Sequence, residues 1–325
     1  MSKPSPTPRP GLSMPADRDG EAARPARREA AAPRSDDAPP AFRREDHARP
    51  GVAEDVAPGI RRLLCPNPGP LTFTGTNTWL LGQSEVTLID PGPDLPEHRE
   101  AILGAAGAGR IVRILVTHTH LDHSAGAPAL QRLTGAPVSG FGAHGPLVGP
   151  GADTRFRPDV VLPDEATVPT EAGLLRALHT PGHCPTHLCF ALEGTGILFS
   201  GDHVMAWSTT AVTPPDGSMA DYMRSLARIA ARDDRLLLPG HGPVLEEPAP
   251  FLAALRRHRE EREAAILRAL DGAAPMTAAE LVPLIYGVAL DPRLAAGAAG
   301  SVLAHLIKLA GEGRITASPE GYRRR

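Results

Sequence analysis

The chain has little cysteine, no long apolar run and no strong net charge, and each shortage argues against a class of protein. Its three cysteines are odd in number and have no C-x-x-C spacing, which favours a reducing compartment. No stretch is long and apolar enough to cross a bilayer, and no secretory signal is visible, so we predict a cytoplasmic protein without a membrane partner. The net charge of -3 gives no global electrostatic reason to bind nucleic acid. A G-x-S-x-G elbow is also missing, which disfavours a serine hydrolase.

Residues 1–50 have almost no large apolar side chains. They contain ten prolines with interleaved arginine, aspartate and glutamate. Such a segment cannot bury enough apolar surface to offset its conformational entropy, so we predict a disordered Pro/Arg/Ala-rich extension. The remainder of the 325-residue chain is long enough for a large catalytic domain over residues 51–254 and a small C-terminal domain over residues 255–325.

Histidine, in contrast, is concentrated in one short segment. An apolar run over residues 111–116 has the branched side chains of a buried strand, and three histidines and an aspartate follow it directly: His118, His120, Asp122 and His123. Imidazole and carboxylate are the ligands that zinc and similar cations select among nitrogen and oxygen donors. The segment therefore predicts a metal site at the end of a strand.

Three further apolar stretches also end in a residue that can bind a metal. Residues 174–182 lead to His183, residues 196–201 to Asp202, and residues 235–240 to His241. Because the same pattern occurs four times along the chain, we expect four strand ends to converge on one site.

The order HxHxDH at residues 118–123, then His183, Asp202 and His241, resembles that of the metallo-β-lactamase fold superfamily over about residues 60–250. Within that superfamily the chain looks most like the β-lactamase-like protein 2 group. The segments that carry this likeness are Asn67-Pro68-Gly69-Pro70, Gly75-Thr76-Asn77-Thr78-Trp79-Leu80-Leu81, Ile89-Asp90-Pro91-Gly92-Pro93, Thr180-Pro181-Gly182-His183 and Leu238-Pro239-Gly240-His241-Gly242. The resemblance implies an α/β (α+β) fold, a four-layer αβ/βα sandwich with a small C-terminal winged-helix domain.

The same resemblance implies a ligand set for two Zn²⁺ ions, with iron and manganese as alternatives. One metal is held by His118, His120 and His183; the second by Asp122, His123 and His241; Asp202 bridges both, with a water or hydroxide between them. Seven ligands around two small cations leave positions open for solvent and substrate, which is typical of a catalytic site. Two metals about 3.5–4 Å apart can lower the pKa of a shared water to near 7 and polarise a substrate oxygen.

Other residues are expected near the site with supporting roles. Asp90 is the preferred carboxylate partner of a ligand histidine, because metal-bound imidazoles donate their second nitrogen to such groups. His187 is a second candidate to approach the pocket. Among Ser208, Thr209, Thr210 and Tyr222, which lie between two ligands, Tyr222 is the candidate to stabilise an oxyanion. The predicted catalytic residues are therefore Asp122, Asp202 and Tyr222.

Helical patterns dominate the C-terminal part of the chain. Ser218 and Asp221 have the spacing of a capping box, which predicts a helix within residues 215–232. Further helices are expected over Arg256–Leu270, Thr277–Tyr286 and Arg293–Ala310, followed by a hairpin over Arg314–Tyr322. The third of these helices offers only Arg293, His305 and Lys308 to nucleic acid, fewer basic residues than a reader of phosphates needs. We therefore favour a packing and pocket-shaping role for this domain.

The resembled group contains both thioesterases of polyketide assembly lines and an endoribonuclease, so three functions stay open. The first is a dinuclear zinc hydrolase that uses a metal-bridging hydroxide on a small-molecule or acyl substrate, an ester or thioester. The second is a metal-dependent endonuclease of single-stranded RNA, and the third is a winged-helix nucleic-acid-binding regulator. The low basic content of the chain puts the acyl substrate first.

Overall fold

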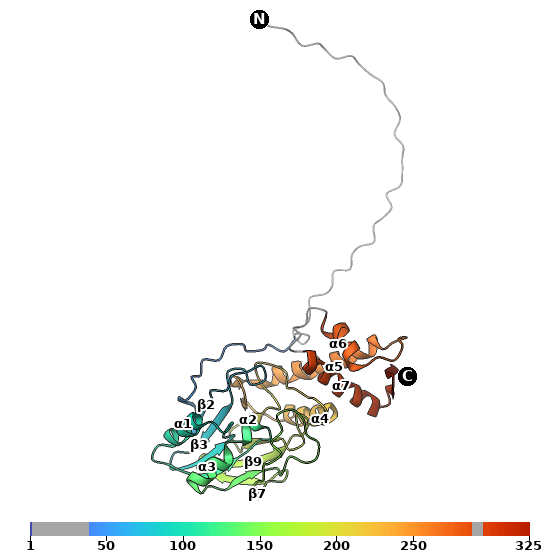
Figure 1. Ribbon diagram of the computed structural model, residues 1–325. Helices are drawn as coiled ribbons and strands as arrows, with labels where there is room; N and C mark the ends of the chain where they lie inside the picture. The colour runs from blue at the N-terminus through green and yellow to red at the C-terminus, as the bar shows by residue number, and fades with distance from the viewer. Residues whose placement is uncertain (2–38, 288–294) are drawn as a thin grey trace, which may run out of the picture.

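The computed structural model describes residue 1, residues 39–287 and residues 295–325 of the chain (Figure 1). Its first sheet contains seven strands in sequence order: β1 (Ala53–Ala57), β2 (Ile60–Leu64), β3 (Asn77–Leu81), β4 (Glu85–Ile89), β5 (Arg110–Leu115), β6 (Val138–Gly140) and β7 (Val160–Val161). Strands β1 to β4 pair antiparallel, and β4 to β7 pair parallel. The helices inserted between the parallel strands are α1 (Pro96–Ala106), α2 (Leu121–Ser124) and α3 (Ala127–Thr134).

The second sheet has six strands in the order β13-β12-β11-β10-β9-β8. Their bounds are β8 (Thr167–Thr170), β9 (Gly173–His179), β10 (Leu188–Leu192), β11 (Ile197–Gly201), β12 (Leu236–Pro239) and β13 (Leu245–Glu246). Helix α4 (Met219–Ala230) connects β11 to β12, the one parallel pair in this sheet, and α5 (Pro248–Ala269) follows β13. Ser218 caps α4 by accepting a hydrogen bond from the backbone N–H of Asp221, as the capping pattern predicts.

Three apolar clusters divide these elements into four layers. One cluster, which includes Trp79 and Phe190, fills the space between the two sheets. A second packs α1 and α3 on the outer face of the first sheet, and a third packs α4 and α5 on the outer face of the second. A sheet with one face on a partner sheet and the other under helices is buried on both sides, which explains the near-continuous apolar strands. The predicted αβ/βα sandwich is confirmed.

The C-terminal elements form the predicted helical domain with a wing, at the opposite end of the molecule from α1 in Figure 1. They are α6 (Ala278–Tyr286), α7 (Ala295–Gly311), and a hairpin of β14 (Ile315–Ser318) and β15 (Gly321–Arg324). Thr277 and Glu280 form a complete capping box at the start of α6. The expected start of α7 at Arg293 lies outside the described residues, and the predicted division at residues 254 and 255 falls within α5, which starts at a proline, Pro248.

Part of the N-terminal segment differs from its prediction. Residues 39–50 were expected to be disordered, yet they lie against the folded domain. The ring of Phe42 packs edge-on against Phe251 at 5.9 Å, and both oxygens of Asp46 accept hydrogen bonds from Arg62, at 2.9 and 2.5 Å. Amino-acid composition indicates whether a segment can fold alone. A segment that does not fold alone can still bind to the surface of a folded domain through a few side-chain contacts, as residues 39–50 do. Residues 2–38 lie outside the described residues.

No helix in the described part of the chain has both the length and the apolar character that a bilayer span requires.

Candidate metal centre

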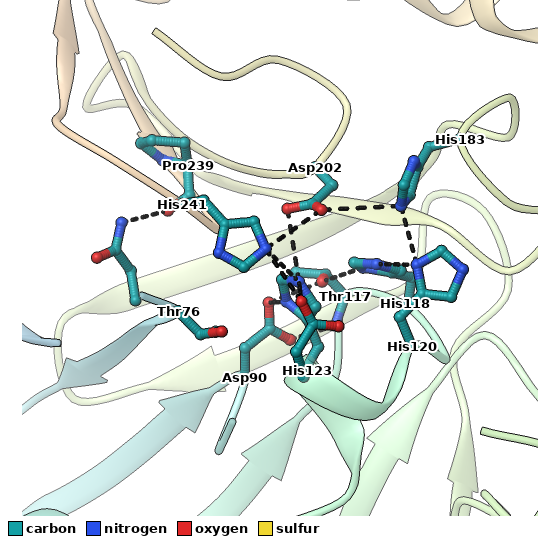
Figure 2. A network of polar contacts seen from close by, with 12 residues as sticks. Thr76, Asp90, Thr117, His118, His120, His123, His183, Asp202, Pro239 and His241 are labelled. Carbon is teal, nitrogen blue, oxygen red and sulfur yellow. Dashed lines mark hydrogen bonds and ion pairs between the residues drawn. The ribbon is translucent and has the colours of Figure 1, made fainter. Parts of the chain in front are cut away.

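The four predicted strand ends meet at one edge of the sandwich (Figure 2). The loop after β5 and the short helix α2 carry four of the seven predicted ligands, and the ends of β9, β11 and β12 are followed by His183, Asp202 and His241. Within this set, the potential ligand atoms of three trios lie within 4.8 Å of one another: His118, His120 and His183; His118, His123 and Asp202; and Asp122, His123 and His241. All seven side chains therefore surround one small volume.

Each of the five histidines has one ring nitrogen fixed by an acceptor. The anchoring contacts are His118 Nδ1 to Thr117 Oγ1 (3.0 Å), His120 Nε2 to Asp216 Oδ2 (3.0 Å), His123 Nδ1 to Asp90 Oδ2 (2.9 Å), His183 Nδ1 to the Ala211 carbonyl (2.7 Å) and His241 Nδ1 to the Gly75 carbonyl (3.1 Å). Carboxylates and carbonyls only accept, and the Thr117 hydroxyl donates its own hydrogen to Asp90 Oδ2, so the hydrogen of each ring sits on the anchored nitrogen. The other nitrogen of each ring faces the centre, and it binds a metal through its lone pair when it carries no proton.

These free nitrogens point at one another instead of at a hydrogen-bond donor. His120 Nδ1 lies 2.9 Å from His183 Nε2 and 3.0 Å from His118 Nε2, and His123 Nε2 lies 3.1 Å from His241 Nε2. Two lone pairs at such distances repel unless a cation or a proton lies between them. Buried polar atoms without a partner are rare, and Asp202 Oδ1 is one of them here. The donor set therefore fits a metal centre.

Asp202 stands between the two groups of histidines. Its Oδ2 is 3.7 Å from His183 Nε2 and 3.4 Å from His241 Nε2, and its Oδ1 is 3.5 Å from His123 Nε2. Asp122 faces only one group, with Oδ2 3.3 Å from His241 Nε2 and 3.8 Å from His123 Nε2. Asp202 is thus the one carboxylate of the seven side chains that can contact both halves of the centre.

Burial and charge set the protonation of these groups. Burial lowers the pKa of His118 well below its usual value and that of His183 to about 4, so both rings are neutral at pH 7. Burial opposes ionisation of Asp202, but the neighbouring His241 and His123 hold its pKa well below the usual range. Burial also lowers the pKa of His241, but the charge of Asp202 outweighs it and raises that pKa to about 9. The same negative field favours a bound cation.

Three of the supporting residues expected from the sequence contact a predicted ligand, either its side chain or its backbone. Asp90 makes the predicted contact with a ligand histidine, and it also accepts hydrogen bonds from the backbone and hydroxyl of Thr117. His187 contacts the backbone of a predicted ligand, because its Nε2 accepts the N–H of Asp202 at 3.0 Å. Thr210 donates its hydroxyl to the carbonyls of Asp202 and His203.

Tyr222 lies in the core of the second sheet's outer layer. Its side chain is fully buried, its ring centroid is 4.8 Å from that of His203, and its hydroxyl has no hydrogen-bond partner among the described residues. The role of this hydroxyl at an oxyanion stays a prediction.

Sequence reasoning missed Asp216, the carboxylate partner of His120. This residue is 6% exposed, and its second oxygen, Oδ1, has no hydrogen bond among the described residues and lies 3.5 Å from His144 Nε2. Pro214, Pro215 and Gly217 around Asp216 have the composition of a turn, and that local signal hid the residue. All three cysteines, including Cys184 beside the predicted ligand His183, are buried free thiols.

The chain matches two family models, one for each part of the fold. The model described as the metallo-beta-lactamase superfamily matches residues 71–241, and that of the beta-lactamase associated winged helix domain matches residues 277–323. Solved structures agree: a beta-lactamase domain protein from Burkholderia ambifaria is 29% identical with a TM-score of 0.73, over 86% of this chain and 96% of that one. A metallo-beta-lactamase family protein from Thermus thermophilus is 27% identical with a TM-score of 0.69, over 83% of this chain and 99% of that one.

The chain is also similar to fungal proteins that are named thioesterases. An atrochrysone carboxyl ACP thioesterase of Aspergillus fumigatus is 33% identical over 249 residues, which are 71% of this chain and 75% of that protein. A protein of the same name from Passalora fulva is 32% identical over 275 residues, 81% of this chain and 78% of the relative.

Proposed function

The chain belongs to the metallo-β-lactamase superfamily, and from that premise we propose that it is a dinuclear zinc hydrolase of thioesters with apolar acyl groups. The predicted class, a metal-dependent hydrolase of this superfamily, is confirmed by the family match and the thioesterase relatives. The identity and number of the metals and the acyl substrate belong to the proposal. The observation that carries it is the position of Asp202 between two groups of anchored histidines.

The residues proposed to hold the metals are the seven that converge: His118, His120, Asp122, His123, His183, Asp202 and His241. Bound divalent cations supply Lewis acidity, which activates water and polarises a carbonyl oxygen. The chain's own contribution is to fix the orientation of five imidazoles through hydrogen bonds and to place a single carboxylate between the halves.

Exposed apolar side chains on the metal-site loop and on the loop that contacts it, which we call the apolar rim, support an acyl substrate. Leu121 lies between two predicted ligands in the chain and is 41% exposed, and Leu147 and Val148 are each 51% exposed. The N–H of Leu121 donates to the Gly151 carbonyl at 2.8 Å, and an isolated bridge joins His120 to Ala152, which holds this loop against the metal-site loop. Exposed apolar side chains beside a polar site are suited to bind the apolar part of a substrate.

The nucleic-acid alternatives lose their main support in the winged-helix domain. His305 is fully buried and contacts Glu263 at 3.3 Å, and Lys308 forms ion pairs with Glu263 and Glu312 at 2.9 and 2.8 Å. The side chain of His305 is buried and that of Lys308 is paired with two carboxylates, so α7 does not present either of them to a phosphate backbone. The third basic residue that the sequence suggested, Arg293, lies outside the described residues.

Release of free thiol from acyl thioesters tests the proposal. The panel should compare acetyl, octanoyl and aromatic acyl groups on N-acetylcysteamine, coenzyme A and a carrier protein, with a labelled single-stranded RNA beside them. We expect metal-dependent thiol release that favours the longer apolar groups and disappears in Asp202→Asn. Cleavage of RNA without thiol release would overturn the substrate class.

Two leucines give a matched pair for the apolar rim. Leu147→Ser should raise KM for an octanoyl thioester about tenfold, because a leucine contact is worth about 1.5–3 kcal/mol when fully buried. Leu133→Ser, a leucine on α3 that is 62% exposed, should leave KM unchanged. Equal effects of the two changes on KM would show that Leu147 does not contact the acyl group.

Elemental analysis of protein purified without added metal should give about two zinc ions per chain, whereas one iron would contradict the proposed centre.

A further inference from the structure

Helix α5 buries a positive charge that has no carboxylate of the described residues within ion-pair distance. Arg259 is 3% exposed, and no acidic side chain among the described residues forms an ion pair with it. Its guanidinium lies 5.1 Å from the ring centroid of Tyr222, donates to the Thr210 carbonyl at 2.6 Å, and leaves Nε without a partner. Moving an unpaired charge out of water costs several kcal/mol, so an arginine here is a poor choice for packing alone.

The group that Arg259 binds belongs to the loop that holds the metal-site residues. The Thr210 hydroxyl donates to the carbonyl of Asp202 at 2.8 Å and to that of His203 at 2.9 Å. The next carbonyl along the chain, that of Ala211, accepts the Nδ1–H of His183 at 2.7 Å. Arg259 thus binds the peptide between Thr210 and Ala211. Thr210 hydrogen-bonds to the backbone of Asp202, and Ala211 to the ring of His183, which are both predicted ligands.

Helix α7 contacts the same loop a few residues further on. A Cβ placed on Gly300 would lie 2.6 Å from the Thr213 methyl group, so the helix backbone itself is in contact with the loop. Three residues beyond Thr213, Asp216 accepts the Nε2–H of His120 at 3.0 Å. Residues 210–216 therefore have α5 and α7 on one side and the anchors of His120 and His183 on the other.

We propose that Arg259 is a positioning residue of the metal centre, through which the C-terminal helices hold the 210–216 loop in the geometry that His183, Asp202 and His120 require. The winged-helix domain is then a structural part of the active site. This inference rests on the proposed metal centre, because the geometry it protects is that of the metal ligands.

Zinc affinity, measured by competition with a fluorescent chelator, tests this role separately from turnover. Removing the guanidinium in Arg259→Met should weaken zinc binding about 10–100-fold, as loss of groups that orient metal ligands does, and Arg259→Lys should recover part of it. Arg256→Met is the matched control, because Arg256 lies one turn earlier on α5 with its side chain 59% exposed, and its zinc affinity should equal that of the unmodified protein.

A double-mutant cycle separates positioning from general destabilisation. Thr210→Val removes the hydroxyl that fastens Asp202 and His203 but leaves the carbonyl that Arg259 binds. If the two residues act through one loop, their effects on zinc affinity should be markedly less than additive. Should Arg259→Met fail to fold, weakened zinc binding in folded Thr210→Val still supports the path from the loop to the ligands.

Folded Arg259→Met with the zinc affinity of the control would overturn the inference. Unchanged affinity in Thr210→Val, in a case where Arg259→Met does not fold, would overturn it too. These outcomes differ from failure of the proposed function, in which the unmodified protein would bind no zinc or would release no thiol from any thioester.

Discussion

The two halves of the metal centre are supported by different parts of the molecule. His120 and His183 in one half depend on Asp216 and Ala211 in the 210–216 loop, which packs on the C-terminal helices. His123 and His241 in the other half depend on Asp90 at the end of β4 and on the carbonyl of Gly75 just before β3. The third histidine of the first half, His118, is anchored on Thr117, whose hydroxyl donates to Asp90. Two of the three histidines in the first half are thus held by a long connection, whereas both histidines of the second half are held next to the sheet.

A chain of hydrogen bonds extends the support of the second half to the N-terminal segment. Asn77 Nδ2 donates to the carbonyls of Pro239 and Gly242, which flank the loop that carries His241, each at 2.9 Å. Its Oδ1 accepts from Arg62 Nε at 2.7 Å, and Arg62 in turn pairs with Asp46. Both ends of the described chain therefore brace the site, and each end supports one half of it. Perturbing each brace separately can test this division.

The largest expected effect on activity comes from substituting Asp202, the carboxylate that contacts both halves of the centre. Asp202→Ala should reduce thioester hydrolysis to background and lower the metal content of the purified protein, because no other of the seven side chains is a carboxylate that contacts both groups of histidines. The fold should survive, since the apolar clusters do not include this residue. Circular dichroism and metal analysis on the same sample check both points, and normal turnover would contradict the assignment.

The two carboxylates that orient histidines should differ in the size of their effect. Asp90 accepts three hydrogen bonds, from His123 and from the backbone and hydroxyl of Thr117. Among the described residues, Asp216 accepts one hydrogen bond, from His120, and leaves its other oxygen without one. We expect Asp216→Asn to weaken zinc binding about 10–100-fold with little change in the melting temperature.

Asp90→Asn should weaken zinc binding by a similar factor and also lower the free energy of unfolding of the metal-free protein. An amide cannot accept from all three donors, and each buried donor left unpaired costs about 1–3 kcal/mol. Chelator competition and chemical denaturation give the two quantities. Equal stability of the two variants would contradict the difference between a support built into the sheet and one built into a loop.

The difference between the halves also explains what could be predicted from the sequence. The seven converging residues follow apolar strands, so their places and their meeting were readable from local patterns. Asp90 was found for the same reason, because it directly follows a strand. Asp216 and Arg259 act through contacts between distant segments, and no local pattern separates them from a turn aspartate and a charged face of a helix. The docked residues 39–50 were missed because composition reports autonomous folding and not binding to a neighbour.

The N-terminal brace gives a smaller but measurable effect on stability. The side chains of Arg62 and Asp46 are 6% and 2% exposed and lie 2.5 Å apart. Breaking a buried pair by removing one partner costs about 3–5 kcal/mol, so we expect Asp46→Asn or removal of residues 1–50 to lower the free energy of unfolding by up to that amount. Removal of residues 1–38 should leave stability unchanged. Denaturant titration of the three proteins checks this, and a large loss on removing residues 1–38 alone would contradict it.

Acid should remove the same contribution. Burial opposes ionisation of Asp46, but hydrogen bonds and the charge of Arg62 outweigh it and hold the pKa of Asp46 below its usual value of 3.8. A carboxyl whose pKa is lowered by folding adds stability that is full above its unfolded pKa and lost as pH falls through its folded pKa. The stability difference between the unmodified protein and Asp46→Asn should therefore be constant from about pH 5 to 7, as measured by denaturant titration, and shrink below about pH 4. A difference that grew in acid would assign the effect to another group.

The smallest expected effect comes from an ion pair on the exposed surface of α5. Arg256 and Glu260 lie 2.8 Å apart at i,i+4 spacing, but their side chains are 59% and 48% exposed. Water screens such a pair, which is worth about 0.3–0.5 kcal/mol, and the order with the cation first is the less favourable one. Glu260→Gln should therefore change the free energy of unfolding by less than about 0.5 kcal/mol, roughly a tenth of the effect of Asp46→Asn. The Arg62–Asp46 pair is buried and has two hydrogen bonds, whereas the Arg256–Glu260 pair is exposed and has one, so the ratio of these effects measures what burial and the second hydrogen bond together contribute to the brace. A ratio near one would mean that the Asp46–Arg62 pair is hydrated in solution, and the N-terminal brace would then have no larger role than a surface contact.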